Sequence, residues 1–451
     1  MGRLFGTDGV RGIANKELTA ALAYSLGVAG GLVLGKGVKG KRPVVLIGRD
    51  TRISGDMLED SISAGLLSMG CDVIKAGVIP TPGVAFLTKE IGAAAGVVIS
   101  ASHNTFEYNG VKFFNARGRK LEDEVENEIE EIIAGNKDVN GHITGSLVGR
   151  TAPRTNDAMK HYTEFLTGSV KTELSGLRIV VDCANGAAYQ SAKAVFGKLG
   201  VRALYMGVNP DGTNINDGCG STHPERMMRR VVKEKADAGL AFDGDADRLI
   251  AADETGRVVD GDKLMFICAK ALKAEGKLKN DLLTATVMSN LGLAEALGKE
   301  GIRLQRADVG DRYVLEMMQK TDSILGGEQS GHIIFLSENT TGDGTYAALR
   351  FLEALVRSGK KASELSAAVT IYPQVLKNAK VKDENKYSFD KDEKIAAAMA
   401  SAEEEMRGRG RMLIRPSGTE PLVRVMLEGE DRKKLDHLAD RMVRLLEDRL
   451  R

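Results

Sequence analysis

The fold is decided by a stretch that begins as an apolar run and ends as a polar turn, Val44-Val45-Leu46-Ile47-Gly48-Arg49-Asp50-Thr51-Arg52. A helical pattern follows at residues 57–69, and a short strand-like run comes after it at residues 73–74. This order of strand, turn, helix and strand is typical of α/β domains, in which helices cover a buried and largely parallel sheet.

The same pattern returns twice farther along the chain. Residues 179–181 form an apolar run that ends in a polar turn, and a helix and a strand at 202–205 follow it. Residues 284–288 form the third run, with a helix at 293–297 and a strand at 302–305. These units predict three similar α/β domains with mixed, mostly parallel sheets.

The C-terminal segment has a different pattern. Three strand-like runs are followed by a charged amphipathic helix, at residues 375–381, 412–414, 422–427 and 431–450. This order predicts an α+β domain at the C-terminus. We therefore expect four domains, at residues 1–152, 153–254, 255–371 and 372–451.

The composition limits the classes of partner. The chain has 451 residues, 28% of them charged, and a formal net charge of +1. This balance argues against nucleic acid or an anionic membrane as a partner, so an anionic substrate needs a local group of basic residues. The four cysteines form no CxxC pair, and we find neither a secretory signal nor an apolar run of about 20 residues. We expect a reduced, cytoplasmic protein.

Four loops carry candidate chemistry, and the first is Gly96-Val97-Val98-Ile99-Ser100-Ala101-Ser102-His103-Asn104. A buried strand delivers small polar residues to its carboxyl end, which is where α/β sheets place ligands. The hydroxyl of Ser102 is a candidate for a covalent intermediate. The competing interpretation is a helix cap or a turn, which Ser and Asn both favour.

The second loop is Leu240-Ala241-Phe242-Asp243-Gly244-Asp245-Ala246-Asp247-Arg248. Three carboxylates alternate directly after an apolar strand, where they would repel one another unless a cation joined them. Oxygen ligands of this kind suit Mg²⁺. Asp243, Asp245 and Asp247 are therefore candidate metal ligands, and an exposed acidic turn is the simpler alternative.

Two known kinds of site have similar patterns of aspartates. The spacing of the aspartates and Glu254 resembles the calcium loop of an EF-hand, but Arg248 stands where that loop needs glycine and the flanks are strand-like. A strand that leads to Asp-x-Asp also occurs in aspartyl-phosphate hydrolases. A phosphatase with Asp243 as its nucleophile therefore stays an alternative.

The third loop is Gly326-Gly327-Glu328-Gln329-Ser330-Gly331-His332. Alternation along an extended loop would place Glu328, Ser330 and His332 on one side. Carboxylate and hydroxyl groups are suited to hydrogen bonds with sugar hydroxyls. A glycine-rich β-turn explains the same residues without any ligand.

The fourth loop is Arg415-Pro416-Ser417-Gly418-Thr419-Glu420-Pro421, with Arg424 beyond it. An arginine next to hydroxyl groups and glycine amides is typical of a phosphate site. The alternative is a turn with a surface arginine.

Taken in this order, the four loops resemble the α-D-phosphohexomutase superfamily from end to end. Phe5-Gly6-Thr7-Asp8-Gly9-Val10-Arg11-Gly12, Gly327-Glu328-Gln329-Ser330-Gly331-His332 and Thr340-Thr341-Gly342-Asp343-Gly344 resemble its bacterial phosphoglucosamine mutase branch. The resemblance implies three similar α/β domains and a different C-terminal domain around a central cleft. It also implies interconversion of glucosamine 6-phosphate and glucosamine 1-phosphate, which feeds UDP-N-acetylglucosamine and cell-wall precursor synthesis.

The resemblance implies a phosphorylated serine and one Mg²⁺ per chain. Ser102 would be the phosphoserine, and the three aspartates would bind Mg²⁺ together with its phosphate. The residues expected near the transferred phosphoryl group are Arg11, His103, Lys112, Arg248 and His332, of which Lys112 and His332 are candidates for proton transfer.

The resemblance also assigns the substrate contacts. Glu328 and Ser330 would bind sugar hydroxyls, and the non-reacting phosphate would be held by Arg415, Ser417, Gly418, Thr419 and Arg424. One departure is Thr105, where many relatives carry proline after Ser-His-Asn, and it puts the stiffness of the loop in doubt.

The implied partners are small molecules and a second copy of the chain. A 1,6-bisphosphate of the hexosamine would be the intermediate and the activator, and Ser102 would need a first source of phosphate. A homodimer is possible within the family. The alternatives are a mutase of glucose or mannose phosphates and a non-catalytic protein that binds sugar phosphates.

Overall fold

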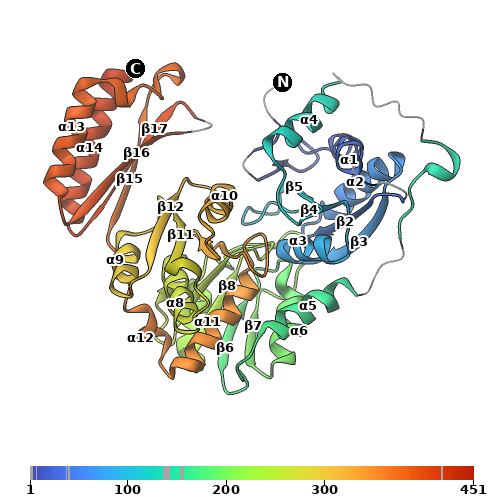
Figure 1. Cartoon of the computed structure of the whole chain (residues 1–451), viewed down its shortest axis with the longest axis horizontal. Coiled ribbons are helices and arrows are strands. Elements are labelled where there is room, and N and C mark those ends of the chain that lie inside the picture. The colour runs from blue at the N-terminus through green and yellow to red at the C-terminus, as the bar shows by residue number, and fades with distance from the viewer. Residues whose placement is uncertain are drawn as a thin grey trace. The chain divides into compact units, whose positions relative to one another are not determined.

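The structure is a computed structural model that describes residues 4–6, 8–36, 38, 41–135, 143–152, 157–417 and 420–451. It divides into two compact units (Figure 1). The first contains Met1–Met288 and Ile302–Ala367, and the second contains Ser289–Gly301 and Ala368–Arg451.

The first α/β region has a five-stranded sheet in the order β1-β5-β4-β2-β3. β2, β3 and β4 are parallel, whereas β5 pairs antiparallel with both β4 and β1. The strands are β1 (Val10–Ile13), β2 (Val44–Arg49), β3 (Asp72–Val78), β4 (Ala95–Ile99) and β5 (Tyr108–Asn115). The helices are α1 (Ala20–Gly35), α2 (Gly55–Ser68), α3 (Thr81–Glu90), α4 (Asp123–Ile133) and the short η1 (Gly145–Leu147).

The second α/β region repeats this plan in the order β10-β9-β8-β6-β7. β7 and β8 flank β6 in parallel, and β9 pairs antiparallel with β8. The strands are β6 (Arg178–Asp182), β7 (Arg202–Met206), β8 (Ala238–Phe242), β9 (Leu249–Asp253) and β10 (Val258–Val259). The helices are α5 (Ala158–Ser169), α6 (Ala188–Lys198) and α7 (Glu225–Glu234).

The third α/β region has four strands in the order β12-β11-β13-β14. They are β11 (Leu282–Thr286), β12 (Arg303–Ala307), β13 (Leu325–Gly327) and β14 (Ile333–Phe335). The associated helices are α8 (Gly261–Ala274), η2 (Lys279–Asp281), α10 (Asp311–Thr321), α11 (Gly344–Ser358) and α12 (Ala362–Ser366).

All three sheets share one topology, which confirms three similar α/β domains. In each, one strand (β2, β6 or β11) is flanked in parallel by the next two strands along the chain, and the strand after these is antiparallel to the second of them. The parallel strands β4, β8 and β11 are buried along their whole length because helices cover the sheets. The sheets are mixed and mostly parallel, as predicted, because in each of them a single strand, β5, β9 or β14, runs against the others.

The second unit is the α+β segment that the sequence predicts. β15 (Gln374–Lys380) and β16 (Gly410–Pro416) each pair antiparallel with β17 (Leu422–Gly429). Figure 1 shows the helices α13 (Glu393–Met406) and α14 (Arg432–Leu450) packed together on this sheet. The unit also contains α9 (Leu291–Lys299), η3 (Asp383–Asn385) and η4 (Phe389–Lys391).

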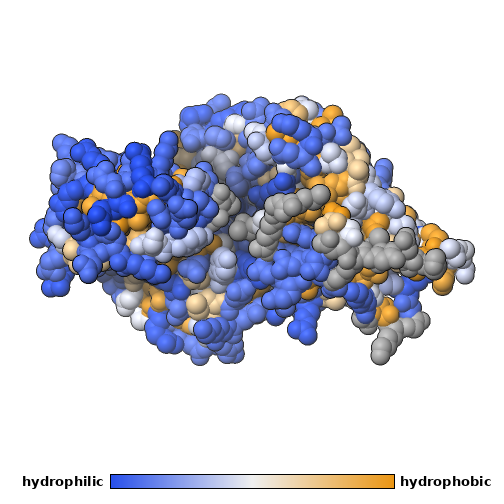
Figure 2. Space-filling model, turned by 90° about the horizontal axis from the view of Figure 1, so that it is seen from above, coloured by the Kyte–Doolittle hydropathy of each residue, from blue (hydrophilic) through white to orange (hydrophobic). Residues whose placement is uncertain are grey.

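Strand ends differ modestly from their predicted positions. The run at 284–288 is a strand only to Thr286, because the chain turns there and the hydroxyl of Thr286 accepts the N–H of Met288 at 3.3 Å. The face seen in Figure 2 is mostly hydrophilic, with hydrophobic residues in small groups. Among the described residues, no helix combines the length and apolar character needed to cross a membrane.

Candidate active site

Ser102 lies in the turn that follows β4. Its φ is +52°, in the left-handed region, and its N–H donates to the hydroxyl of Ser100 at 3.0 Å. Ser100 in turn donates to Asp50 Oδ2 at 2.6 Å. A non-glycine residue in this conformation costs free energy that the surrounding hydrogen bonds must offset, and such positions gather at functional sites.

A buried arginine holds the carbonyl groups of this turn. Arg52, 1% exposed, donates to the carbonyls of Ser102 at 3.0 Å and of Asn104 at 2.9 Å. Its Nε donates to Asp50 Oδ2 at 2.8 Å, so its charge is paired. The amide of Asn216 donates to the same two carbonyls, each at 2.9 Å. The backbone of the serine turn is therefore fixed from both sides.

The departure at Thr105 lies within this arrangement. The carbonyls of Thr105 and Tyr108 also accept from Arg52, the latter at 2.9 Å. The guanidinium thus restrains the segment where many relatives use proline. Arg52 therefore holds the carbonyls on both sides of Asn104 and Thr105 by hydrogen bonds.

The second loop brings three carboxylates together at the end of β8. Asp243, Asp245 and Asp247 are all buried, and each offers one oxygen atom within 4.8 Å of the others. The Ser102 hydroxyl donates to Asp243 Oδ2 at 2.6 Å. Gly244 permits this approach of two loops, because a Cβ at that position would lie 2.5 Å from the Ser102 carbonyl oxygen.

The charge state of these carboxylates depends on their neighbours. Burial and the two other aspartates raise the pKa of Asp243 well above its ordinary value. Burial and Asp245 likewise raise the pKa of Asp247. Burial acts the same way on Asp245, but the Lys112 ammonium and the Thr81 hydroxyl, which donates at 2.7 Å, outweigh it and lower that pKa.

These carboxylates fit a divalent cation. Within the described part of the chain, Asp245 Oδ1 and Asp247 Oδ1 are buried without a hydrogen-bond partner. Buried oxygens of this kind are costly unless something binds them. Oxygen donors in a compact group are what Mg²⁺ and similar hard cations require, so the group could hold a metal ion.

Lys112, on β5, connects the aspartate group to the N-terminal motif. Its ammonium lies 2.9 Å from Asp245 Oδ2 and 3.0 Å from Asp8 Oδ2, and the side chain is 2% exposed. Burial alone would lower the pKa of Lys112, but Asp245 and Asp8 raise it above its ordinary value. Arg11, on β1, also pairs with Asp8. The lysine is therefore a buried cation beside the aspartate group.

His103 and Arg248 lie together beside Ser102. Arg248 Nη1 donates to His103 Nδ1 at 3.1 Å. His103 Nδ1 also lies 3.5 Å from the hydroxyl oxygen of Ser102. Burial, Arg248 and Arg11 lower the pKa of His103 to about 4. The imidazole is consequently neutral at neutral pH, with its proton on Nε2.

The third loop is the turn between β13 and β14. The Ser330 hydroxyl donates to Glu328 Oε2 at 3.3 Å, and both residues face the same cavity as His332. The N–H of Gly342 donates to His332 Nε2 at 3.1 Å, so a neutral ring carries its proton on Nδ1. His332 Nε2 also lies 3.9 Å from Asp247 Oδ2.

Residues of these three loops line one open cavity of about 440 Å³. Acidic and basic groups both line it, as a ligand with phosphate and hydroxyl groups requires. Its walls are formed by Asp8, Arg11, His103, Asp247, Arg248, Thr286, Met288, Val309, Gly310, Asp311, Glu328, Gln329, Ser330 and His332.

The fourth loop belongs to the second unit and joins β16 to β17. Arg415 and Arg424 are opposite one another in the antiparallel ladder, so two guanidinium groups emerge side by side. The buried Ser417 donates its N–H to Leu422 at 2.9 Å, and Arg424 pairs with Glu420 at 3.3 Å. Gly418 and Thr419, which the sequence analysis names as phosphate ligands, lie outside the described residues.

With this geometry established, comparison with known proteins gives the family. Models of the phosphoglucomutase/phosphomannomutase family match four consecutive segments of the chain. Domain I matches residues 2–140, domain II 160–256, domain III 260–372 and the C-terminal domain 376–445. The chain belongs to the phosphoglucomutase/phosphomannomutase family.

Curated relatives give the branch of the family. Phosphoglucosamine mutase from Alkaliphilus metalliredigens is 53% identical over 450 residues, which cover both chains completely. The enzymes from Alkaliphilus oremlandii and Caldanaerobacter subterraneus are each 54% identical over the same full coverage. The chain is therefore a mutase enzyme similar to phosphoglucosamine mutases throughout.

Solved structures show the same fold. A phosphoglucomutase/phosphomannomutase family protein from Burkholderia thailandensis has a TM-score of 0.83 at 25% identity, and 99% of this chain and 97% of that one are covered. The N-acetylphosphoglucosamine mutase of Aspergillus fumigatus, solved with GlcNAc-6P and magnesium, has a TM-score of 0.69 at 18% identity, covering 99% and 95%.

The residues that hold the catalytic side chains of this mutase in place were not predicted from the sequence. Asp50, Arg52 and Asn216 fix the serine turn, and Asp8 and Thr81 hold Lys112 and Asp245. Asp8 lies in the N-terminal motif together with Arg11, and an acidic residue this close to an arginine could have indicated an ion pair. Asn216 offered none, because its contacts join residues more than 100 positions apart.

Proposed function

We propose that this mutase interconverts glucosamine 6-phosphate and glucosamine 1-phosphate by means of a phosphorylated Ser102. The observation that carries the proposal is the 2.6 Å hydrogen bond between the Ser102 hydroxyl and Asp243, in a group of three buried carboxylates. A serine that is held in a strained turn and lies next to a metal-binding group is suited to phosphoryl transfer.

The reaction has two transfers. The 1-hydroxyl of glucosamine 6-phosphate attacks the phosphorus of phospho-Ser102, the bond from phosphorus to Oγ breaks, and the 1,6-bisphosphate forms. After the bisphosphate has turned, Ser102 Oγ attacks the 6-phosphate and the bond to O6 breaks, which releases glucosamine 1-phosphate. Each transfer passes one proton from the attacking hydroxyl to the departing oxygen.

The residues around Ser102 divide this work. Lys112 is a buried ammonium, so it suits the donation of a proton to the departing oxygen and the stabilisation of phosphoryl charge. Arg11 and Arg248 supply further positive charge for the phosphoryl oxygens. The imidazoles of His103 and His332 are the remaining candidates for proton transfer.

The three aspartates would hold one Mg²⁺ per chain together with the phosphate of Ser102. When bound, this ion would neutralise charge on the phosphoryl group and on the departing serine oxygen. The Aspergillus fumigatus enzyme was solved with magnesium, and a variant of that enzyme was solved with glucose 1,6-bisphosphate. We extend both to this chain, with a hexosamine 1,6-bisphosphate as intermediate and activator.

The remaining roles concern binding. Glu328 and Ser330 accept and donate hydrogen bonds to sugar hydroxyls, and the non-reacting phosphate is bound by Arg415, Ser417, Gly418, Thr419 and Arg424. We also propose four domains that end at residues 152, 254, 371 and 451. The protein would be cytoplasmic and would form a homodimer. Ser102 would receive its first phosphate from a separate source.

The test is a coupled assay of the purified chain on glucosamine 6-phosphate, with Mg²⁺ and a trace of bisphosphate. We expect Ser102→Ala to lower turnover by at least about 10⁴-fold. Ser61→Ala, on the helix α2, is a matched control that should keep full activity. A phosphopeptide that contains residue 102 and survives acid supports the proposal, whereas an acid-labile one at Asp243 supports the phosphatase. Glucose and mannose phosphates, assayed in parallel, test the alternative substrates.

A further inference from the structure

Lys120 is a partly buried cation, with 18% of its side chain exposed, and its ion pairs are with neither the aspartate group nor the serine. Its ammonium pairs with Asp8 Oδ1 and lies 2.5 Å from Asp311 Oδ2. Burial would lower the pKa of Lys120, but Asp311 and Asp8 raise it well above its ordinary value, so it is charged at every working pH. This lysine joins the first α/β region to the third at the edge of the active-site cavity.

The two carboxylates that Lys120 holds are contacts of catalytic candidates. Asp8 also lies 3.0 Å from Lys112 Nζ, and Asp311 Oδ2 lies 3.7 Å from His332 Nε2. Lys112 and His332 in turn approach the aspartate group, at 2.9 Å from Asp245 and 3.9 Å from Asp247. Polar side chains thus form a continuous series of contacts, and Lys120 is the member separated by the most contacts from Asp245 and Asp247.

The backbone presents Lys120 in a fixed position. Residue 120 forms an isolated β-bridge with Phe114, and Asn115 and Arg119 close the turn between them. Gly118 in this turn has a φ of +68°, and a Cβ there would lie 2.3 Å from the carbonyl oxygen of Ala85. The carbonyl of Gly118 also accepts the Thr340 hydroxyl. The lysine is therefore built into the fold rather than free on the surface.

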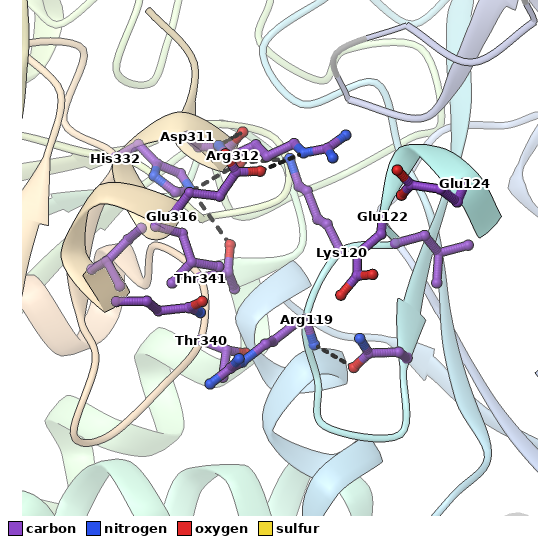
Figure 3. Close-up of a pocket in the computed structure, with 15 residues that line it drawn as sticks. Arg119, Lys120, Glu122, Glu124, Asp311, Arg312, Glu316, His332, Thr340 and Thr341 are labelled. Atoms are coloured by element: carbon purple, nitrogen blue, oxygen red, sulfur yellow. Dashed lines mark hydrogen bonds and ion pairs between the residues drawn. The ribbon is translucent and has the colours of Figure 1, made fainter. Parts of the chain in front are cut away.

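Lys120 lines a second cavity, which shares Asp311 and His332 with the first. It has a volume of about 260 Å³ and is lined by Lys120, Asp311 and His332 among others. Figure 3 shows Lys120 reaching across this cavity to Asp311, with Arg312 and Thr341 nearby. Lys120 itself does not line the 440 Å³ cavity, whereas Asp8 and Asp311 line it. The second cavity therefore offers a small amine a route to Asp311 and to the space that the Lys120 side chain would vacate in Lys120→Ala.

We infer that Lys120 is a positioning residue of the mutase reaction. Resting on the proposed function, it holds Asp8 and Asp311 in place, and through them it orients Lys112 and His332. Without its charge, two partly buried carboxylates would repel each other at the cavity edge, and their shift would displace Lys112 and His332. The consequence falls on the transfer step, because Lys120 makes no contact with the substrate cavity.

The experiment compares Lys120→Ala, Lys120→Arg and wild type on whichever hexosamine or hexose phosphate the wild type turns over. We expect Lys120→Ala to lower kcat by about 10- to 100-fold with KM changed less than about threefold. Lys120→Arg keeps the charge and should retain most of kcat. Ethylammonium ions added to Lys120→Ala should restore kcat in a saturable way, and an equal concentration of Na⁺ should not.

Lys36→Ala is the matched control, because Lys36 pairs with Glu128 at 2.6 Å on the exposed surface of the same region. It should keep its kcat and show no response to the amine. A wild-type kcat in Lys120→Ala overturns the inference. A lowered kcat that neither arginine nor the amine recovers assigns Lys120 a structural role only, and so overturns it too. Failure of the proposed function is visible separately, as a wild type without mutase turnover or an active Ser102→Ala.

Discussion

The aspartate loop after β8 groups negative charges in the interior, whereas the arginine loop between β16 and β17 groups positive charges that are partly exposed to water. Asp243, Asp245 and Asp247 are 0%, 1% and 6% exposed, so three like charges share an interior. Arg424 keeps 32% of its side chain exposed, beside Arg415 on the next strand. Water therefore screens the arginines, whereas the aspartates depend on neighbouring cations.

The surroundings differ in the same way. The aspartates are reached by Ser102, Thr81 and Lys112, which come from three separate elements. The arginine loop is held mainly by contacts within its own hairpin, between Ser417 and Leu422 and between Arg424 and Glu420. A preorganised interior suits transfer chemistry, which tolerates little displacement, and a locally closed hairpin suits capture of a phosphate.

The largest effect that this contrast predicts is on catalysis. Asp245→Asn removes one metal-binding charge and leaves Lys112 with a single acidic partner, so we expect kcat to fall about a thousandfold. KM should change little, because the aspartate does not line the substrate cavity. The measurement is steady-state turnover over a range of Mg²⁺ concentrations. A variant with normal kcat at ordinary Mg²⁺ would remove the aspartate group from the mechanism.

The arginine loop should respond in the opposite parameter. Arg415→Ala loses a charged partner of the phosphate, worth about 2 kcal/mol, so KM should rise about 30-fold while kcat falls only slightly. Arg432→Ala, whose side chain is 69% exposed on α14, is the control and should have a normal KM. If kcat rather than KM carries the loss for Arg415→Ala, the two regions do not divide the work as proposed.

Local patterns were enough to predict much of the fold. The apolar runs before residues 50, 182 and 289 marked the central strand of each α/β region, because a strand buried on both faces needs continuous apolar residues. The antiparallel strand β5 and its edge partner β1 were not predicted, since their pairing joins residues about 100 positions apart.

The residues of the candidate site also fall into those that local sequence patterns predict and those that depend on contacts far apart in the chain. Ser102 and the three aspartates follow apolar strands directly, so their chemistry was visible in the sequence. Arg52 was not predicted, because its function depends on reaching the carbonyls of Ser102 and Asn104, about 50 positions away. Residues that bind or react carry chemical signatures, and residues that hold them acquire their role only when the chain has folded.

A smaller effect is expected on the free energy of unfolding, which should depend on charge in the aspartate loop. Without a bound cation, Asp247→Asn relieves repulsion within the aspartate group, so we expect the free energy of unfolding in a chelator to rise by about 1 kcal/mol. Mg²⁺ should stabilise the wild type but stabilise the variant less. Asp448→Asn, on an exposed position of α14, should change neither value. The measurement is urea unfolding with chelator and with Mg²⁺, and a destabilised variant in chelator would show that repulsion is not the dominant force.

The smallest effect is on the pH dependence of the metal-free protein. The pKa values of Asp243 and Asp247 are raised, so the folded state binds these protons more tightly than the unfolded state does. Their contribution to stability is full below the unfolded value of about 3.9 and is lost as pH rises through the folded values. In chelator, the Tm of the wild type should therefore fall by about 1 to 2 °C between pH 5 and pH 7 relative to the double variant Asp243→Asn/Asp247→Asn.

Other buried carboxylates do not disturb this comparison of the two proteins. Burial raises the pKa of Asp343 to about 6, but that group is common to both proteins and cancels. Asp245 has a lowered pKa, so it loses its contribution only below this window. Saturating Mg²⁺ should abolish the pH dependence of the Tm difference between the two proteins, because the bound ion replaces the protons on the aspartates. A pH dependence that persists in Mg²⁺ would place its origin outside the aspartate group.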